Sequence, residues 1–281
     1  MKNKGLVITL IVILSIFVLA LTGGLIYLLQ NGSNIIFNFD FENTNLRLVE
    51  SKEVEPTEIN KVYINLYSTD LVIKSSENEK ILVEYYSNRE NNPKIELEKE
   101  TLIVDETKYD VSCIGFCNSR RRVVLYLPET YENELELTTK SGDITATNNL
   151  SKNILNITTS SGDVKLNQTG TINATTSSGD VRIDRTEIVK VNTSSGEIEI
   201  NTITSKANLQ TSSGDIEISK INLKENSTIK TSSGDVDISN NEGNCYVETQ
   251  TSSGDTKIKK SDRKSDIVLR IKTSSGDISV N

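Results

Sequence analysis

Apolar and polar residues alternate strictly along the C-terminal half of the chain, on both sides of a short glycine-containing phrase. The phrase is "TSSGD" or a close variant, and it occurs eight times. Relative to each glycine, the positions seven and five before it and two and four after it are apolar at 29 of 32 sites, the exceptions being Ser227, Thr249 and Thr256. The intervening positions are polar in all 24 cases. A period of two is typical of strands with one buried face, so each repeat is predicted to contain two short strands joined at the glycine.

The repeats are spaced as the coils of a solenoid would be. Consecutive glycines of the phrase lie 17 to 22 residues apart, a length that suits one coil each. Because a single strand pair cannot bury its apolar row alone, neighbouring coils are expected to stack about 4.8 Å apart as parallel sheets around internal apolar columns. The predicted fold class is therefore all-β, a parallel β-solenoid of about eight to nine short coils.

Each residue type of the phrase has an expected role at the corner between the two strands. Glycine is expected to adopt a backbone angle that a side chain would penalise. Serine and the acidic residue are expected to satisfy turn amides, and the threonine three positions before each glycine to form hydrogen bonds from rung to rung. The structural ladder predicted at the corner consists of Gly142, Asp143, Gly162, Asp163, Gly179, Asp180, Gly196, Glu197, Gly214, Asp215, Gly234, Asp235, Gly254, Asp255, Gly276 and Asp277.

A β-rich region precedes the repeats. Residues 135–281 hold the repeats, and residues 55–134 are predicted to form a cap and an initial rung. The rung is a degenerate coil, "YINLYSTDLVI" around Asp70, while "ILVEYY", "KIELEKETLIV" and "RRVVLYLPE" predict longer strands of hairpins. The cap would protect one end of the stack from edge-to-edge pairing. The other end is predicted to be covered by the spacer 259–266 or to support end-to-end self-association.

The N-terminal segment is predicted to anchor the chain in a membrane. Residues 6–29 are 24 residues without a charge, enough to span a bilayer as one helix. A cleaved secretory signal is the main alternative, but its apolar core is usually shorter, about 7 to 15 residues. Lys2 and Lys4 precede the span and the next basic residue is Arg47, so residues 1–5 are predicted to be cytoplasmic and the rest, after a linker at 30–54, extracytoplasmic.

The charge balance restricts the classes of partner. The whole chain has 31 basic and 39 acidic residues, and only two of the basic residues precede residue 35. Nucleic acid and anionic lipid are disfavoured as general partners, because both require a basic surface. Cations, basic partners, surface or envelope proteins and glycans remain candidates.

The loop from Lys108 to Arg122 is the least repetitive part of the predicted exterior. Cys113 and Cys117 are candidates for a small disulfide, with three reduced cysteines as the alternative. Ile114 and Phe116 followed by Arg120, Arg121 and Arg122 form a candidate contact loop for an anionic membrane surface or a partner. The simpler interpretation is a loop folded against the first rung as part of the cap.

The stacked carboxylates are the main candidate for chemistry. Calcium would relieve their mutual repulsion, but hydrogen bonds from serine and backbone amides do so without a metal, and the calcium-binding nonapeptide pattern is missing from the sequence. No cofactor is therefore predicted. Some solenoid enzymes that act on polysaccharides group aspartates with Lys or Arg, which here would involve Lys165, Arg182 and Arg185. Because the carboxylates repeat uniformly, no coil is specialised for catalysis, and the chain is predicted not to be an enzyme.

The order of these features resembles a known family. A single N-terminal span, an early "LYSTDLVI" strand, a "RRVVLYLPE" strand and serial "TSSGD" coils are similar to the bacterial putative-adhesin family, a domain of unknown function, over residues 55–281. The resemblance implies a surface-exposed and often membrane-anchored β-solenoid, associated by name with adhesion and in some relatives with cell-envelope stress systems. It implies no catalytic residues.

The expected function is therefore non-catalytic. We expect a membrane-anchored surface-interaction or adhesin-like module. An accessory or regulatory protein of a bacterial envelope-stress system is the alternative, and an enzyme acting on polysaccharide is a third hypothesis.

Overall fold

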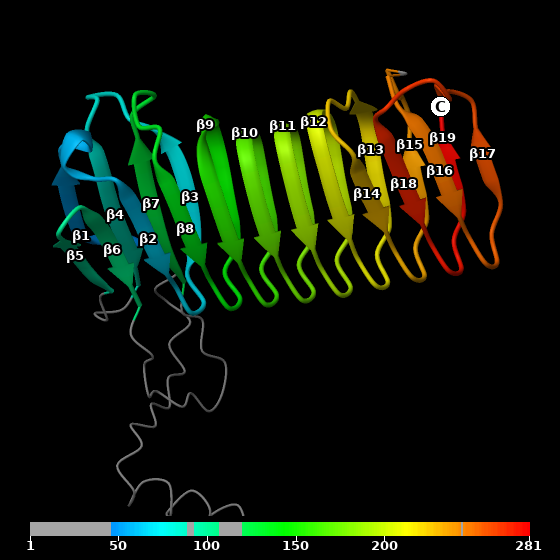
Figure 1. Cartoon of the computed structure of the whole chain (residues 1–281). Helices are drawn as coiled ribbons and strands as arrows, with labels where there is room; N and C mark the ends of the chain where they lie inside the picture. The colour runs from blue at the N-terminus through cyan, green and yellow to red at the C-terminus, as the bar shows by residue number, and fades with distance from the viewer. Residues whose placement is uncertain (1–45, 89–92, 107–119, 243) are drawn as a thin grey trace, which may run out of the picture. The chain divides into compact units, whose positions relative to one another are not determined.

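The computed structural model describes residues 46–88, 93–106, 120–242 and 244–281. Its strands belong to one compact unit, residues 45–107 and 120–281, and make one continuous, mainly parallel sheet (Figure 1). A 3-10 turn, Pro56–Glu58, lies between the first two strands. The all-β, mainly parallel and solenoid-like prediction is confirmed. The predicted transmembrane helix at 6–29 lies outside the described residues, and within the described ranges no helix has the length and apolar character of a membrane span.

The N-terminal strands include both parallel and antiparallel neighbours. They are β1 (Arg47–Val54), β2 (Lys61–Asn65), β3 (Asp70–Ser75), β4 (Ile81–Ser87), β5 (Lys94–Glu98), β6 (Thr101–Asp105), β7 (Arg121–Leu127) and β8 (Glu134–Thr138). β1 pairs antiparallel with β4, β4 with β7, and β5 with β6, whereas the remaining pairings of these strands are parallel. The predicted hairpin strands of the cap are thus present.

The repeats form the remaining strands, all of them paired in parallel. They are β9 (Ile144–Thr158), β10 (Val164–Thr175), β11 (Val181–Asn192), β12 (Ile198–Gln210), β13 (Ile216–Ile221), β14 (Ser227–Lys230), β15 (Val236–Ile238), β16 (Tyr246–Gln250), β17 (Thr256–Ile258), β18 (Val268–Lys272) and β19 (Ile278–Val280). The long strands β9 to β12 run from one glycine corner to the next, as the side-by-side ribbons of Figure 1 show.

Each coil has two outward faces, named here by their position relative to the glycine corner. The upstream face belongs to strands that enter the corner: β2, β8, the second halves of β9 to β12, β14, β18 and β16. The downstream face belongs to strands that leave it: β3, the first halves of β9 to β12, β13, β15, β19 and β17. Between the two faces lies one continuous apolar core.

The inward side chains form buried columns, as the alternation predicts. Val189, Val191, Ile198 and Ile200 of one coil are all fully buried. Burial of such a side chain contributes about 1.5–3 kcal/mol, so stacking supplies the apolar burial that one coil lacks. Of the three polar exceptions, only Ser227 is buried, and its hydroxyl accepts a hydrogen bond from the N–H of Ala207.

The coils at the C-terminal end do not stack in the order of the sequence. β19 lies between β15 and β17, and β18 lies between β14 and β16. The coil of Gly276 is therefore inserted between the coils of Gly234 and Gly254, and Figure 1 shows β17 beyond β19. The last coil of the sequence is therefore not the outermost coil of the stack. Thr249 and Thr256 are tolerated at inward positions because they belong to the outermost coil, where burial is incomplete.

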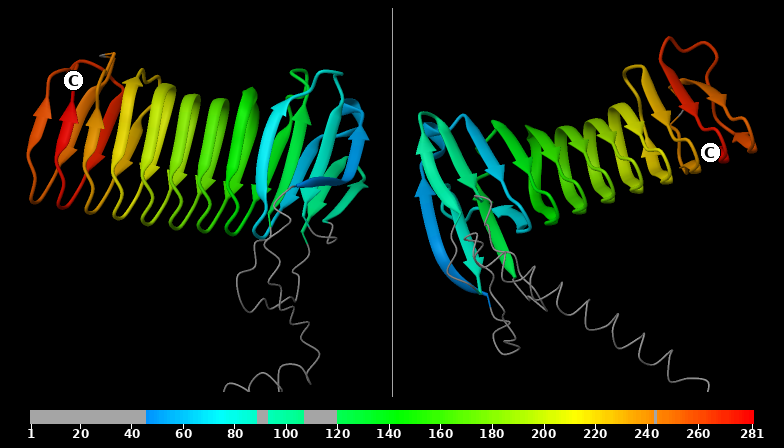
Figure 2. Two further views of the ribbon diagram at one scale, coloured as in Figure 1. Left: turned by 180° about the vertical axis from the view of Figure 1, so that it is seen from behind. Right: turned by 90° about the horizontal axis from the view of Figure 1, so that it is seen from below.

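The N-terminal end has the same kind of inversion. The initial rung, β2 and β3, lies between the β6–β7 coil on one side and the β8–β9 coil on the other. Beyond the β6–β7 coil, β4 and then β1 continue the sheet from β7 on the downstream side, and β5 continues it from β6 on the upstream side (Figure 2). β1 begins at Arg47, so the predicted linker at 30–54 was wrong for its last eight residues.

The corner glycines are required by the close approach of neighbouring coils. A Cβ atom added to Gly162, Gly179 or Gly196 would lie well under 3.0 Å from the carbonyl oxygen of the preceding coil's glycine. None of the corner glycines has a φ between +20° and +160°. The prediction that glycine supplies a special backbone angle was therefore wrong, and the space needed for stacking selects glycine instead.

A methyl group at a central corner should force the coils apart. Gly196→Ala is expected to lower the free energy of unfolding by at least the 1–3 kcal/mol typical of overpacking, about one order of magnitude or more in the folding equilibrium. The measurement is urea unfolding followed by circular dichroism. Ser195→Ala, at an exposed position beside it, is the matched control and should change stability by less than about 0.5 kcal/mol. Equal midpoints for the two variants would contradict the stacking explanation.

The inverted order can be tested by disulfide trapping. Asp237 and Ser279 are opposite each other on adjacent strands, and Lys257 lies one strand beyond Ser279. With native cysteines replaced by alanine, D237C/S279C should form a disulfide on mild oxidation. D237C/K257C should not, because Cα atoms two strands apart are separated by about 9.6 Å, beyond the reach of a disulfide. The readout is mobility on a non-reducing gel. The opposite pattern would show that the coils follow the order of the sequence.

Candidate functional site

The corner threonines form a buried hydrogen-bond relay between coils. Each threonine hydroxyl accepts a hydrogen bond from the N–H of the glycine three residues later, at 3.0–3.1 Å, in the coils of Gly142, Gly162, Gly179, Gly196, Gly214 and Gly234. The hydroxyls of Thr211 and Thr231 donate to the glycine carbonyl of the preceding coil, at 3.2 and 3.1 Å. Rung-to-rung bonding is thus confirmed, but it runs through glycine backbone groups rather than between hydroxyls.

The predicted acidic ladder is present and caps backbone amides. The N–H of one corner acid donates to Oδ1 of the acid in the adjacent coil at 2.8–3.2 Å. The donor and acceptor pairs are Asp143 to Asp70, Asp163 to Asp143, Asp180 to Asp163, Glu197 to Asp180, Asp235 to Asp215, Asp277 to Asp235 and Asp255 to Asp277. Among the described residues, no group of three or more His, Cys, Asp or Glu side chains is arranged to hold a metal ion. Each of these carboxylate oxygens thus caps a backbone amide of the adjacent coil.

Glu197 is the irregular member of the ladder. Its carboxylate lies 3.4 Å from the Arg182 guanidinium, which also contacts Asp180 and Glu199 at 3.1 Å. Burial is the main reason that the pKa of the Glu197 carboxyl is raised, with Glu217 as the next cause, and Arg182 opposes the rise. The folded state therefore binds a proton at Glu197 more tightly than the unfolded state does, and ionised Glu197 opposes folding.

Removing this charge should stabilise the protein in a pH-dependent way. The penalty for ionised Glu197 is fully present at pH 7 and vanishes as the pH falls below the ordinary pKa of glutamate, because both states are then protonated. Glu197→Gln is therefore expected to raise the urea midpoint at pH 7, with a gain that shrinks toward about pH 3.5. Glu187→Gln, at an exposed position on β11, is the control for net charge. A gain that is independent of pH, or equal in both variants, would refute the assignment.

The base of the predicted contact loop is built around a buried ion pair. The fully buried side chain of Glu106 pairs with Arg121, and its oxygens accept hydrogen bonds from the N–H of Tyr67 at 2.7 Å and the hydroxyl of Thr69 at 2.9 Å. Arg121 also donates to the Ser68 hydroxyl at 3.1 Å. Removing one partner of such a pair is strongly destabilising, because the other charge stays buried.

This ion pair changes the interpretation of the loop. Arg121 has a structural role at the base, while Arg120 and Arg122 are exposed. Cys113, Ile114, Phe116 and Cys117 lie outside the described residues, so the proposed disulfide and apolar tip stay predictions. Cys245 is free and buried, and burial raises the pKa of its thiol. Glu106 was missed by sequence reasoning, although it continues the inward parity of β6, in which Leu102 and Val104 are buried.

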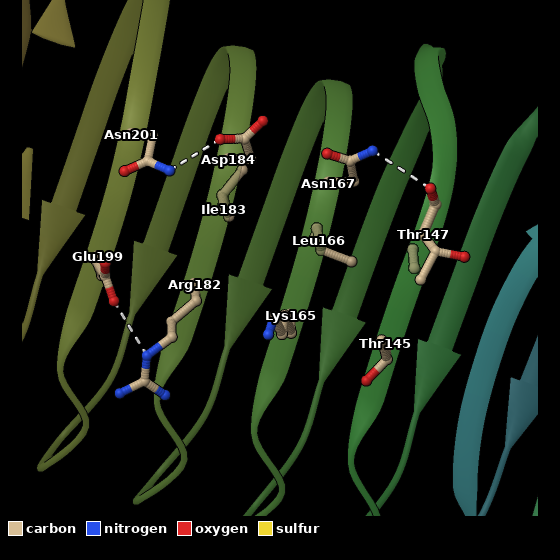
Figure 3. A pocket seen from close by; sticks show the side chains of 11 residues that line it. Thr145, Thr147, Lys165, Leu166, Asn167, Arg182, Ile183, Asp184, Glu199 and Asn201 are labelled. Carbon is tan, nitrogen blue, oxygen red and sulfur yellow. Dashed lines mark hydrogen bonds and ion pairs between the residues drawn. The ribbon is translucent and has the colours of Figure 1, made fainter. Parts of the chain in front are cut away.

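A polar groove crosses four coils on the downstream face (Figure 3). Its volume is about 530 Å³, and the strands beneath it contribute Leu166 and Ile183, which are buried in the core. The rim consists of outward residues of β9, β10, β11 and β12. Six of the lining residues are Thr145, Lys165, Asn167, Arg182, Glu199 and Asn201.

The groups around the groove are held by contacts between adjacent coils. Nδ2 of Asn201 donates to Oδ1 of Asp184 at 2.8 Å, and Nε of Arg182 donates to Oε2 of Glu199 at 3.1 Å. Lys165 and Arg182 are opposite each other on neighbouring strands, which gives the groove two adjacent cations. Of the cations considered for a polysaccharide-active site, Lys165 and Arg182 line the groove, whereas Arg185 does not. The arrangement offers hydrogen-bond donors and acceptors from four coils rather than a specialised acid and base.

These features define the class of protein to which the chain belongs. The described residues form a solenoid-like repeat protein with outward polar faces, a continuous core and a shallow polar groove. Residues 59–281 match the sequence model of the family described as Toastrack DUF4097, and the chain belongs to this family. A comparison with curated protein sequences finds no significant match.

Solved structures are similar to this chain at low sequence identity. A protein from Parabacteroides distasonis described as a "putative lipid binding protein" is 16% identical, with 88% of this chain and 100% of that chain covered and a TM-score of 0.51. A "putative adhesin" from Bacteroides fragilis is 15% identical, with 85% and 98% of the two chains covered and a TM-score of 0.44. At this level of identity the first likeness shows a common fold and nothing about ligands.

Proposed function

We propose that this protein is a non-catalytic, membrane-anchored surface module that binds its target through the outward faces of the coils, as an adhesin does. Residues 6–29 would form the anchor, with residues 1–5 in the cytoplasm and the described coils outside the cell. The membership of the Toastrack family and the uncharged N-terminal stretch support this proposal.

The groove on the downstream face is the observation that carries the proposal. Its polar groups come from four coils in a repeating arrangement, and its two carboxylates, Asp184 and Glu199, are already engaged with Asn201 and Arg182. A catalytic pair needs two groups in unlike environments that converge on one reacting atom. A series of amides, hydroxyls and charges suits a polar, hydroxyl-rich ligand such as a glycan, held by several modest hydrogen bonds of about 0.5–1.5 kcal/mol each.

Adhesion should depend on the amides and the carboxylate of the groove. Cells displaying the full chain are expected to bind immobilised glycans, and N167A/D184A/N201A should weaken binding about tenfold or more, since the loss of several hydrogen bonds exceeds about 1.4 kcal/mol. The measurement is cell retention on a glycan array under flow. N173A/N192A/N208A removes three amides from the upstream face and is the matched control. Equal binding by both variants, or no glycan binding by the parent, would refute the groove as the binding site.

Replacing residues 1–29 with an unrelated membrane anchor separates this function from a regulatory one. A surface module keeps its binding when the anchor is exchanged, because its ligand contacts lie in the coils. An accessory protein of an envelope-stress system would instead lose its effect on the stress response, because its own helix would contact the membrane partner. Loss of adhesion with a correctly displayed exchanged anchor would therefore contradict the proposal.

A further inference from the structure

The two faces of the stack carry opposite charge over the same group of coils. From the coil of Gly196 to that of Gly276, the charged residues six and four positions before each corner glycine, on the upstream face, are all cations: Lys190, Lys230, Arg270 and Lys272. Over the same coils, the charged residues one and three positions after each corner glycine, on the downstream face, are all carboxylates: Glu197, Glu199, Asp215, Glu217, Asp235, Asp237 and Asp277. These sets are called the basic strip and the acidic strip. Further along β13, the cation Lys220 is paired with Glu242.

Most of these charges are available to a partner. Lys190, Lys230, Lys272, Glu217 and Asp237 are exposed, and no ion pair within the described residues involves any of them. At the borders of the strips, Arg270 pairs with Glu248 at 2.8 Å, and Arg182 contacts Glu197 and Glu199. The core separates the two strips, so a cation of one strip cannot reach a carboxylate of the other within the same molecule.

We propose that copies of this chain associate side by side, with the basic strip of one copy docked on the acidic strip of the next. A second copy is the occupant that the charges favour, because one molecule carries both complementary surfaces. The two strips also share the same coil spacing of about 4.8 Å, so charges on parallel copies stay in step along the whole contact. A different basic or acidic partner would match only one of the two faces.

The area of a face is sufficient for a specific contact. On the upstream side ten strands pair in parallel, in the order β6, β2, β8, β9, β10, β11, β12, β14, β18 and β16. At about 4.8 Å per strand and about 17 Å of strand length, the whole face covers about 800 Å², the share that each partner contributes to a standard interface, and the four strands of the basic strip, β11, β12, β14 and β18, supply about 330 Å² of it. Side chains between the charges are polar and of moderate size, such as Asn208, Thr228 and Ser239, which leaves the strips accessible.

The contact joins different faces, so it does not close on itself. A row of copies leaves one basic strip free at one end and one acidic strip free at the other, so further copies can add at both ends. Self-association of this kind requires no bound glycan or other ligand. It therefore goes beyond the proposed function and does not depend on it.

Sedimentation velocity of the full chain in detergent micelles tests the proposal. The parent protein should form dimers and larger species as its concentration rises, and more so at about 0.01 M ionic strength than at 0.15 M, because salt screens exposed charges. K190E/K230E/K272E makes the basic strip acidic and should weaken self-association at least tenfold. K224E/K260E/K264E changes the charge equally at exposed positions in the connections between strands, and it should behave like the parent.

A charge-swap mixture gives the decisive result. E199K/E217K/D237K makes the acidic strip basic, so this variant alone should also be monomeric. Mixed with K190E/K230E/K272E, it should form a complex, because each variant now presents the charge that the other has lost. Circular dichroism confirms that both variants are folded before mixing. A monomeric parent at low ionic strength, or folded variants that do not combine, would overturn the proposal.

Discussion

The structure depends on how closely two neighbouring coils approach at the glycine corner. There is no room for one methyl group between the Cα of a corner glycine such as Gly196 and the carbonyl oxygen of Gly179 in the preceding coil. At that distance the threonine hydroxyl reaches both its own glycine N–H and the neighbour's carbonyl, and the aspartate reaches the N–H of the adjacent aspartate. The corner thus fixes the register of each coil, and the register aligns the inward valines and isoleucines into columns.

The same constraint determines what the outward surface can offer. Because every coil repeats the same register, outward residues at equivalent positions form straight rows, and function can arise only from the choice of side chains along these rows. Lys165 and Arg182 beside Glu199 produce a groove with mixed charge, whereas Glu217 and Asp237 further along produce an acidic strip. The groove and the proposed side-by-side contact both consist of such rows of outward side chains on successive coils.

Much of the fold follows from the sequence, because strand, corner and core all leave a periodic signal. The order of the coils does not, since every coil presents nearly the same corner and the same apolar columns to either neighbour. Thr249 and Thr256 are the residues from which this order could have been predicted. Polar residues at inward positions indicate the outermost coil, which has a neighbouring coil on one side only. β1 and Glu106 lie outside the repeats, so their roles depend on contacts between distant residues such as Val54 with Ile81 and Glu106 with Arg121. The groove and the charged strips could not be predicted from the alternation alone, because their residues come together only when the register between neighbouring strands is known.

Amide hydrogen exchange at the corner glycines tests the stacked, partly inverted architecture most directly. The N–H groups of Gly196 and Gly214 are buried and hydrogen-bonded to threonine, so they should exchange only through global unfolding. Gly254, in the outermost coil, should exchange faster than Gly276, although Gly276 is nearer the end of the sequence. Faster exchange at Gly276 than at Gly254, or rapid exchange at all the corners, would contradict the account.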